Sequence, residues 1–386
     1  MGVPERLGAR IAARLAALDR EGLTRTLAGP SGIDLSSNDY LCLSRDPRVV
    51  ARLVEGVHEH GVGSTGSRLL RGERASTSRL EARFAAFKGA ARSLYFSSGY
   101  LANLAVVATF AEPGDLIISD GLNHASLIDG IRLAKAERAI APHADPAALE
   151  QLLANRRTTG QAFVVTESIF SMDGDEAPLA DYAEICQRHG AALVVDEAHA
   201  VGIYGRRGSG LVEETGTEDG VWLTVNTAGK ALGVSGAFVA GDAPAVDYLI
   251  QRGRPMLFST AAPPALAEAI GESLAIVEGE PALRGRVRAL ASLLRSALRD
   301  RQLPVMDGRS QVVPILVGDN ERAVALSRDL QAQGFDVRAV RPPTVPAGTA
   351  RLRVSVNTGL TETVLHDFVA ALAANWERTT LCAASS

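Results

Sequence analysis

The chain has 386 residues, of which 46% are hydrophobic and 22% charged, a composition that fits one large globular domain with a smaller one. Its formal net charge is −4 and no basic block stands out, so neither a nucleic-acid nor an anionic-membrane surface is indicated. We therefore expect a small-molecule partner. The cysteines Cys42, Cys186 and Cys382 lie far apart, which predicts neither a disulfide framework nor a zinc site, and no metal is expected.

The N-terminal fifty residues begin with an amphipathic helix that lacks an apolar signal core, and they are expected to pack against both domains. Short apolar, β-branched runs then alternate with helical stretches, at 93–98, 116–119, 162–168, 192–199, 222–226 and 237–241. Segments between them, such as 178–190, repeat apolar residues every three or four positions and end in glycine, as a capped helix does. This alternation predicts an α/β fold with a mostly parallel, doubly wound sheet covered by helices.

The order of predicted strands and helices changes over the last hundred or so residues. A long helix from about Pro281 to Arg301 precedes runs at 311–319, 335–340 and 350–357, which are separated and closed by helical stretches. This pattern predicts a smaller α+β domain. We accordingly divide the chain into an N-terminal segment (1–50), a large domain (51–275) and a C-terminal small domain (276–386). No run approaches the roughly 18 apolar residues of a membrane span, and a cytoplasmic protein is expected.

Two predicted strands end in polar residues, at the edge where open α/β sheets bind ligands. The run "ALVVDEAH" ends with Asp196 followed by His199. Asp196 alone is also explained as the cap of the next helix. The run "AFVVTESIFSMDGD" carries three further polar side chains, although its Asp-Gly pair is also strong turn chemistry: Glu167, Ser171 and Asp173. Two such strand ends together favour a binding site.

Lys230 lies among small, uncharged residues in "NTAGKALGVSG", just after another predicted strand. The commonest location of a lysine is the solvated surface. Here, however, apolar runs on both sides predict a partly buried amine, whose pKa falls far enough for it to attack a carbonyl. We interpret Lys230 as a Schiff-base lysine.

A carboxylate and a lysine at two strand ends form the pair that pyridoxal phosphate (PLP) needs, because the carboxylate keeps the pyridine nitrogen protonated while the amine binds the aldehyde. In "YFSSGYLANL", Ser97 and Ser98 precede a helix whose N-terminus, at Gly99 and Tyr100, suits the phosphate. His124, after the run 116–119, is placed either to stack on the ring and move protons or only to cap a helix.

The segment "GVGSTGSR" (61–68) has the glycine spacing of a dinucleotide fingerprint, but a helical pattern precedes it where the fingerprint requires a strand. Its glycines are better explained by a loop near the active site or a subunit contact. The remaining histidines have no comparable setting and are interpreted as structural: His58, His60, His143, His189 and His366.

With Asp196, His199 and Lys230 in place, the chain resembles the α-oxoamine synthases, PLP-dependent enzymes of the aspartate-aminotransferase fold type (fold type I). The resemblance runs nearly end to end, through "SSNDYLCLS", "GSTGSRLLRG", "SSGYLANL", "NHASLIDG", "TESIFSMDGD", "VVDEAHAVGIYG", "TAGKALGVSG", "FSTAAPP" and "RPPTVPAGTARLRVSVN". It implies a large PLP-binding domain and a small C-terminal domain.

The resemblance also implies catalytic roles. Lys230 would bind the cofactor and move the Cα proton of the amino acid, Asp196 would pair with the pyridinium, and His199 would hydrogen-bond the ring's phenolic oxygen. Ser171 would assist near that oxygen, and His124 would stack on the ring face.

The remaining roles concern the phosphate and the substrates. The phosphate would be held by Thr227 with the Gly99–Tyr100 backbone, and by Ser259 and Thr260 of a neighbouring subunit. The substrate carboxylate would be held by Arg353 and Asn38, with Arg25 as a further substrate contact, while Glu167 receives no defined role.

Within the family, "GSTGSR" and "RPPTVPAGTARLR" (341–353) are most like enzymes that condense L-alanine with a pimeloyl thioester, either the CoA ester or that of a carrier protein. The resemblance implies a homodimer with active sites at the subunit interface. Three alternatives stay open: condensation of glycine or another amino acid with a different acyl-CoA, transaminase or lyase chemistry, and a silent binding or scaffolding homologue.

Overall fold

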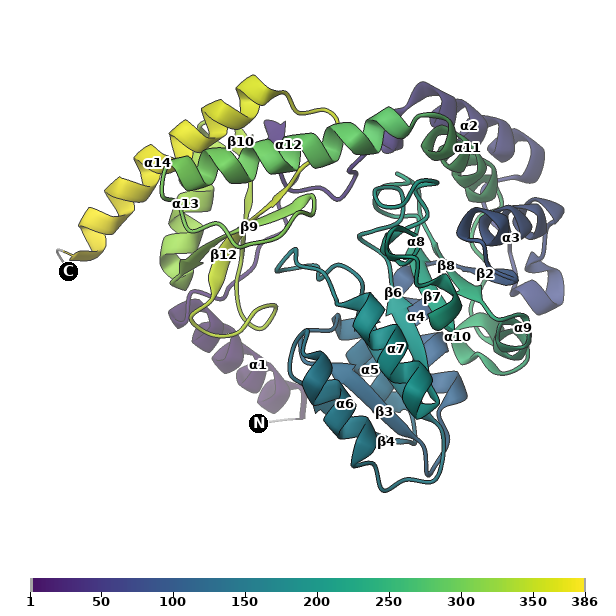
Figure 1. Cartoon of the computed structure of the whole chain (residues 1–386). Coiled ribbons are helices and arrows are strands. Elements are labelled where there is room, and N and C mark those ends of the chain that lie inside the picture. Colours follow the sequence, from purple (N-terminus) through teal and green to yellow (C-terminus); the bar gives the residue numbers. More distant parts are fainter. Residues whose placement is uncertain (1–2, 385–386) are drawn as a thin grey trace.

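The computed structural model describes residues 3–384, with side chains up to residue 379. Cys42 and Cys186 are free thiols, and the side chain of Cys382 lies outside the described set. Helix α12 (Pro281–Asp300) runs across the molecule from the helices beside a seven-stranded sheet to a separate three-stranded sheet (Figure 1). Within the described part of the chain, no helix combines the length and the apolar composition needed to cross a bilayer.

The central sheet is mostly parallel, as predicted. Only β8 runs antiparallel to its neighbours. In spatial order the strands are β2 (Arg92–Phe96), β8 (Ala237–Gly241), β7 (Leu223–Thr227), β6 (Ala191–Asp196), β5 (Ala162–Glu167), β3 (Leu116–Asp120) and β4 (Glu137–Ala141). The strand β4 was not predicted, because this edge strand is largely exposed and its sequence "ERAIA" lacks the apolar run of a buried one.

Helices cover both faces of this sheet, because inward residues alternate along each strand: Val164 belongs to the core on one face and Val165 to the core on the other. The first core includes residues from α3 (Ala75–Lys88), α6 (Pro146–Ala154), α7 (Leu179–His189), α8 (Leu211–Thr215) and α11 (Ala265–Gly279). The second includes residues from α4 (Gly99–Phe110), α5 (Ala125–Leu133), α9 (Ala243–Arg252) and α10 (Arg254–Leu257).

Helix α7 shows how the sequence pattern produces this packing. Its buried residues include Leu179, Tyr182 and Cys186, which lie three or four positions apart and therefore on one face. Burial of a large apolar side chain contributes about 1.5–3 kcal/mol. The helix ends at Gly190, which adopts the left-handed conformation (φ 61°) and whose N–H donates to the last turn, as predicted.

The C-terminal part of the chain has its own sheet and core. Strands β11 (Arg338–Val340), β12 (Ala350–Ser355) and β9 (Val312–Gly318) form an antiparallel sheet. The helices α12, α13 (Asn320–Ala332) and α14 (Glu362–Ala384) pack around a core that is separate from the two described above. The predicted single strand at 335–340 is wrong: β10 (Phe335–Asp336) and β11 belong to different sheets, so the chain changes partner at Val337.

Residues 33–45 link the two parts of the fold, as predicted. Strand β1 (Ile33–Asp34) pairs in parallel with β10, and Leu35 enters the C-terminal core, whereas Tyr40 and Leu43 enter a core of the central sheet. A short 3-10 helix, η1 (Leu43–Arg45), then leads into α2 (Pro47–His60). Because helix α2 and not a strand precedes "GVGSTGSR", the rejection of a dinucleotide fingerprint is confirmed; a π-helical turn, η2 (Arg68–Gly72), follows.

Helix α1 (Val3–Arg20) does not follow the expectation that the N-terminal segment packs against both domains. It buries no residue. One row of apolar side chains along it is exposed: Val3, Leu7, Ile11, Leu15 and Leu18.

Candidate active site

The predicted site residues gather at the carboxyl edge of the central sheet. Because β3, β5, β6 and β7 run parallel, their ends meet at this edge. His124 follows β3, Glu167 ends β5, Asp196 ends β6, and Thr227 ends β7, three residues before Lys230. Glu167 and Asp196 are direct register partners, so two carboxyl groups lie side by side.

Lys230 is partly exposed in a turn closed by a hydrogen bond from the Gly233 N–H to the Lys230 carbonyl, at 2.8 Å. Burial of the amine lowers the pKa of Lys230 to about 8, although the carboxylates of Asp196 and Glu167 oppose the shift. More of the amine is therefore uncharged near neutral pH than in a solvated lysine, and the uncharged form is the one that attacks a carbonyl.

A close approach of two loops brings the segment after β6 beside this lysine. Gly202 has a φ of 87°, and a Cβ at that position would lie 2.7 Å from the Cβ of Ala231. Only glycine allows this contact. The turn that carries His199 is thereby packed against the turn that carries Lys230.

Asp196 is 5% exposed and is held by two hydrogen bonds. Its Oδ1 accepts from the Ala198 N–H at 2.9 Å, and its Oδ2 accepts from the Asn103 amide at 2.7 Å. The same amide donates to Ser126 Oγ at 2.9 Å. Asn103 was not predicted as a functional residue; the available signal was a buried polar side chain in the otherwise apolar helix α4.

Glu167 carries an oxygen that has no protein partner. The side chain is 3% exposed, and Oε1 is buried without a hydrogen bond to any described residue. Burial, reinforced by the nearby Asp196 carboxylate, raises the pKa of Glu167 well above its usual value. A buried polar atom without a partner costs free energy, and this oxygen, on a residue paired in register with Asp196, fits a site built around a polar bound group.

The structure confirms that His124 caps a helix, whereas its stacking on the cofactor ring stays a prediction. Its Nδ1 accepts from the Ser126 N–H at 3.2 Å, which caps the N-terminus of α5, and lies 2.7 Å from Ser126 Oγ. The residue is nevertheless exposed. Helix capping and an open ring face are therefore compatible at this position.

The predicted phosphate anchor has the expected geometry. Helix α4 begins at Gly99, and its N-cap Ser98 accepts from the Leu101 N–H. A Cβ built at Gly99 would lie 3.8 Å from Thr227 Oγ1, so the helix N-terminus adjoins the end of β7. Free N–H groups at such a terminus suit an anion. The hydroxyl of Tyr100 donates instead to Asp129, which leaves only its backbone for this role.

Ser259 and Thr260 line a small pocket together with Ser97 of the same chain. They are thus near the start of α4 even within one subunit. Their predicted contribution to a neighbouring subunit's site stays a prediction.

Arg353 reaches the site from the C-terminal sheet. It is 8% exposed, and its Nε donates to the Ser171 carbonyl at 2.6 Å. Its Nη1 donates to Ser355 Oγ at 2.8 Å and to Asn38 Oδ1 at 3.2 Å. Its Nη2 makes no hydrogen bond to the described residues. The Nη2 amino group is therefore free to donate to a carboxylate.

His199 completes the cluster. It is 4% exposed, and its Nδ1 lies 2.6 Å from the hydroxyl oxygen of Tyr40. Burial, together with the charges of Lys230 and Arg353, lowers the pKa of His199 well below its usual value, so the ring is neutral. Tyr40 lies within "SSNDYLCLS", but no spacing in the sequence links positions 40 and 199, so the sequence does not predict this contact.

Arg25 is exposed, and its Nη2 donates to the Pro342 carbonyl at 2.9 Å. It therefore lies beside the loop that precedes β12. None of its hydrogen bonds joins it to the Lys230 cluster. Its role as a substrate contact stays a prediction.

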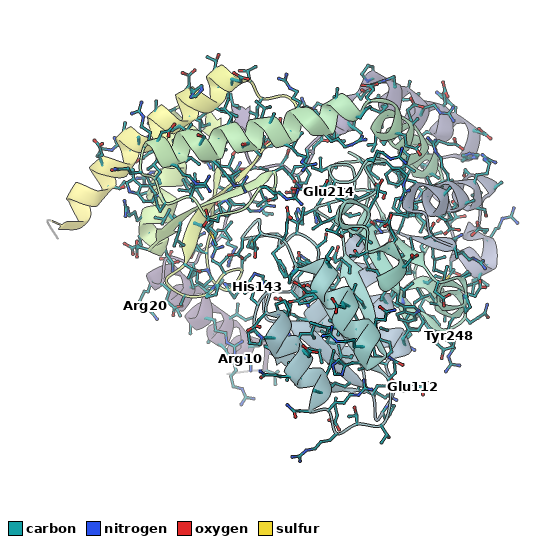
Figure 2. The ribbon with its side chains drawn as sticks, in the orientation of Figure 1. Arg10, Arg20, Glu112, His143, Glu214 and Tyr248 are labelled. Atoms are coloured by element: carbon teal, nitrogen blue, oxygen red, sulfur yellow. The ribbon has the colours of Figure 1, made fainter. Side chains whose placement is uncertain are left out.

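His143, interpreted as structural, connects the central sheet to the loop that carries Ser171. Its Nδ1 pairs with Asp120 at 2.9 Å and its Nε2 with Asp175 at 2.7 Å. It lies on the side of the central sheet that faces the C-terminal sheet (Figure 2). Although burial opposes the charge, the two carboxylates raise the pKa of His143 to about 10.

Replacing His143 by glutamine is expected to lower the free energy of unfolding at pH 7 by about 0.5–3 kcal/mol. The raised pKa means that the stabilisation is fully present below about pH 6.5 and is lost as the pH rises through about 10. Urea unfolding of the two proteins at pH 7 and pH 10 tests this. Equal differences at both pH values would contradict the ion-pair account.

The comparisons with known proteins agree with this geometry. The family model of class I and II aminotransferases matches residues 30–372. An 8-amino-7-oxononanoate synthase from Burkholderia cenocepacia is 44% identical over 362 residues, which cover 89% of this chain and 92% of the relative.

Two solved structures are also similar. A serine palmitoyltransferase from S. paucimobilis with bound PLP and myriocin is 27% identical, with a TM-score of 0.91 over 99% of this chain and 100% of that one. An 8-amino-7-oxononanoate synthase from Francisella tularensis is 28% identical, with a TM-score of 0.78 over 90% and 98%. The fold is that of the fold type I PLP-dependent enzymes.

The chain therefore belongs to the class I and II aminotransferase family and, within it, to the family of the 8-amino-7-oxononanoate synthases.

Proposed function

We propose that the chain catalyses the decarboxylative condensation of L-alanine with pimeloyl-CoA, or with the same acyl group on a carrier protein. The products are 8-amino-7-oxononanoate, CO2 and the free thiol, in a step of biotin biosynthesis. The observation that carries the proposal is the 44% identity to a synthase of this name over nearly the whole chain. The cluster of Lys230, Asp196 and Arg353 supports it.

The cofactor of this reaction is PLP, and the residues present fit it. When bound, PLP supplies an electron sink for the bonds at the Cα atom of the amino acid. Lys230 would be the amine that holds it, and Asp196 would be the carboxylate that keeps its ring nitrogen protonated. His199 and Ser171 would hydrogen-bond its phenolic oxygen, and His124 would stack on its ring.

The phosphate is held, in this proposal, by the backbone N–H groups of Gly99 and Tyr100 and by the hydroxyl of Thr227. Ser259 and Thr260 of a neighbouring subunit add hydroxyl groups. The support for this arrangement is the contact between the N-terminus of α4 and the end of β7.

The chain's own residues orient the substrate and move its protons. The free Nη2 of Arg353, assisted by Asn38, would bind the carboxylate of alanine and so orient the substrate for the breaking of the bonds at its Cα atom. The Lys230 amine takes the Cα proton, and a new bond then joins this carbon to the thioester carbonyl as the thiol leaves. After loss of CO2, Lys230 returns a proton to the same carbon.

A substrate panel tests the function. The PLP-loaded protein is incubated with alanine, glycine or serine in combination with acetyl-, succinyl-, pimeloyl- or palmitoyl-CoA, and the product mass and free thiol are measured. Alanine with pimeloyl-CoA is expected to give the highest rate. Preference for glycine would assign the chain to another α-oxoamine synthase activity, and amino transfer without thiol release would contradict condensation altogether.

We also propose that the protein acts as a cytoplasmic homodimer. Large apolar side chains of the segment 62–70 are exposed, with Leu70 at 86% and Val62 at 79%. The neighbouring Phe258 is 73% exposed, and a hydrogen bond from the Ala261 N–H to the Gly66 carbonyl joins the two segments. Such a patch is typical of a subunit interface, and it lies beside Ser259 and Thr260.

The double variant Leu70→Asp, Phe258→Asp is expected to sediment as a monomer and to lose most of its activity, whereas the unmodified protein sediments as a dimer. The reason is that two charges placed in a desolvated interface cost several kcal/mol. The exposed Leu133→Asp, outside this patch, is the matched control. A monomeric unmodified protein with full activity would rule out the shared site.

A further inference from the structure

Tyr40 makes a short contact with His199 that the proposed mechanism does not use. Its hydroxyl oxygen lies 2.6 Å from Nδ1 of His199 and 3.0 Å from Oδ1 of Asn38. The residue is fully buried, and it reaches the site from the N-terminal segment. A phenol carries one proton, so it donates to only one of these two acceptors at a time.

The ring of His199 has only one proton to place. Because the imidazole is neutral, one of its nitrogens is a donor and the other an acceptor. Its Nδ1 faces Tyr40, while its Nε2 has no hydrogen-bond partner among the residues that the structure describes. If the hydroxyl of Tyr40 donates to Nδ1, the ring proton is on Nε2, which is then a donor. If the hydroxyl donates to Asn38 instead, Nδ1 carries the ring proton and Nε2 is an acceptor.

The surroundings favour donation to His199. Asn38 Oδ1 already accepts a hydrogen bond from Arg353 Nη1, at 3.2 Å. The contact from the Tyr40 hydroxyl to His199, at 2.6 Å, is also shorter than its contact to Asn38, at 3.0 Å. Burial raises the pKa of Tyr40, although the positive charge of Arg353 opposes the shift, so the hydroxyl keeps its proton to donate.

The backbone of the turn is fixed as well. The side-chain amide of Gln311, which is fully buried, donates to the His199 carbonyl at 2.6 Å. With the carbonyl fixed on one side and Nδ1 on the other, the ring has a single orientation.

We propose that Tyr40 is a positioning residue that donates to Nδ1 of His199, sets the Nε2–H tautomer, and so makes Nε2 the hydrogen-bond donor at the cofactor site. Its relevance to the phenolic oxygen of PLP rests on the proposed function. The tautomer itself does not, because it is set by contacts between residues of this chain.

The proposal has a consequence for substrate binding. Asn38 Oδ1 accepts from Arg353 and competes with His199 for the Tyr40 proton, so the guanidinium expected to hold the alanine carboxylate and the histidine expected to contact the cofactor share this neighbour. A change at Asn38 that attracts the Tyr40 proton must therefore reverse the tautomer of His199.

The tautomer is measured directly by NMR of protein labelled with 15N-histidine, with and without PLP, and His199→Gln identifies the signal. The unmodified protein is expected to show the Nε2–H form. Tyr40→Phe removes the donor and is expected to lose this preference and to shift the pH midpoint of the cofactor's visible band by about 0.5–1 unit. Asn38→Asp, whose carboxylate attracts the Tyr40 proton, is expected to give the Nδ1–H form.

Tyr95→Phe is the matched control, since Tyr95 is also a buried tyrosine but donates to the Ser235 carbonyl at 2.7 Å. It is expected to leave both the tautomer and the midpoint unchanged. An Nδ1–H tautomer in the unmodified protein, or an unchanged tautomer in both Tyr40→Phe and Asn38→Asp, overturns the proposal. If the Nε2–H form is found but the protein does not bind PLP, the proposed function fails while the hydrogen bond stands.

Discussion

Replacing Lys230 by alanine is expected to abolish condensation, with a fall of at least about 100-fold, the lower end of what a positioned acid–base group contributes. It is also expected to remove the covalent attachment of PLP, because no other amine has the required setting. Mass spectrometry after borohydride reduction measures the attachment: the unmodified protein gains the mass of the reduced cofactor on the peptide that contains Lys230.

The sequence provides unusually clean controls, since it contains only three lysines. Lys88 is buried, donates to the Glu197 carboxylate and to the Ser209 carbonyl, and is committed to the protein interior. Lys135 is exposed in the connection between α5 and β4, so Lys135→Ala is expected to behave like the unmodified protein. Persistence of reducible cofactor in Lys230→Ala would show that the wrong lysine was chosen.

The pKa of Lys230 adds a pH dependence to the same experiment. The amine must be uncharged to attack the aldehyde, and burial lowers its pKa to about 8. Capture of added PLP by the cofactor-free protein is therefore expected to accelerate as the pH rises from 6.5 and to level off above about 8. A rate that kept rising toward pH 10.5 would mean that the amine is solvated.

Replacing Arg353 by alanine is expected to lower kcat/KM for alanine by about 10–150-fold, because hydrogen bonds to a charged group contribute about 1.5–3 kcal/mol. The loss should appear mainly in KM for the amino acid, since the free Nη2 of the guanidinium is the proposed carboxylate contact. Initial rates at fixed pimeloyl-CoA and varied alanine measure it.

Two observations separate a binding role of Arg353 from a structural one. Its Nε and Nη1 hold Ser171, Ser355 and Asn38, so Arg353→Ala also affects the fold, and urea unfolding measures that part. Arg353→Lys keeps the positive charge but lacks the planar fork and is expected to give an intermediate KM. An unchanged KM for alanine in a folded Arg353→Ala protein would remove Arg353 from the substrate site.

The sequence by itself determined most of the fold and the main chemistry. The apolar runs predicted six of the seven strands of the central sheet, because a buried strand needs an uninterrupted apolar sequence. The exposed strand β4 lacks that signal and was missed. Lys230 and Asp196 were found in the same way, as polar residues that follow buried strands at the carboxyl edge of a parallel sheet.

Only the tertiary structure decided how residues distant in the chain meet. Tyr40 contacts His199, and Arg353 donates to the Ser171 carbonyl. His143 pairs with Asp175 in the loop that carries Ser171. These contacts join the N-terminal segment, the central sheet and the C-terminal sheet. The physical reason is that sequence periodicity reports which face of one element is buried, whereas a hydrogen bond between elements depends on their relative placement, which packing alone determines.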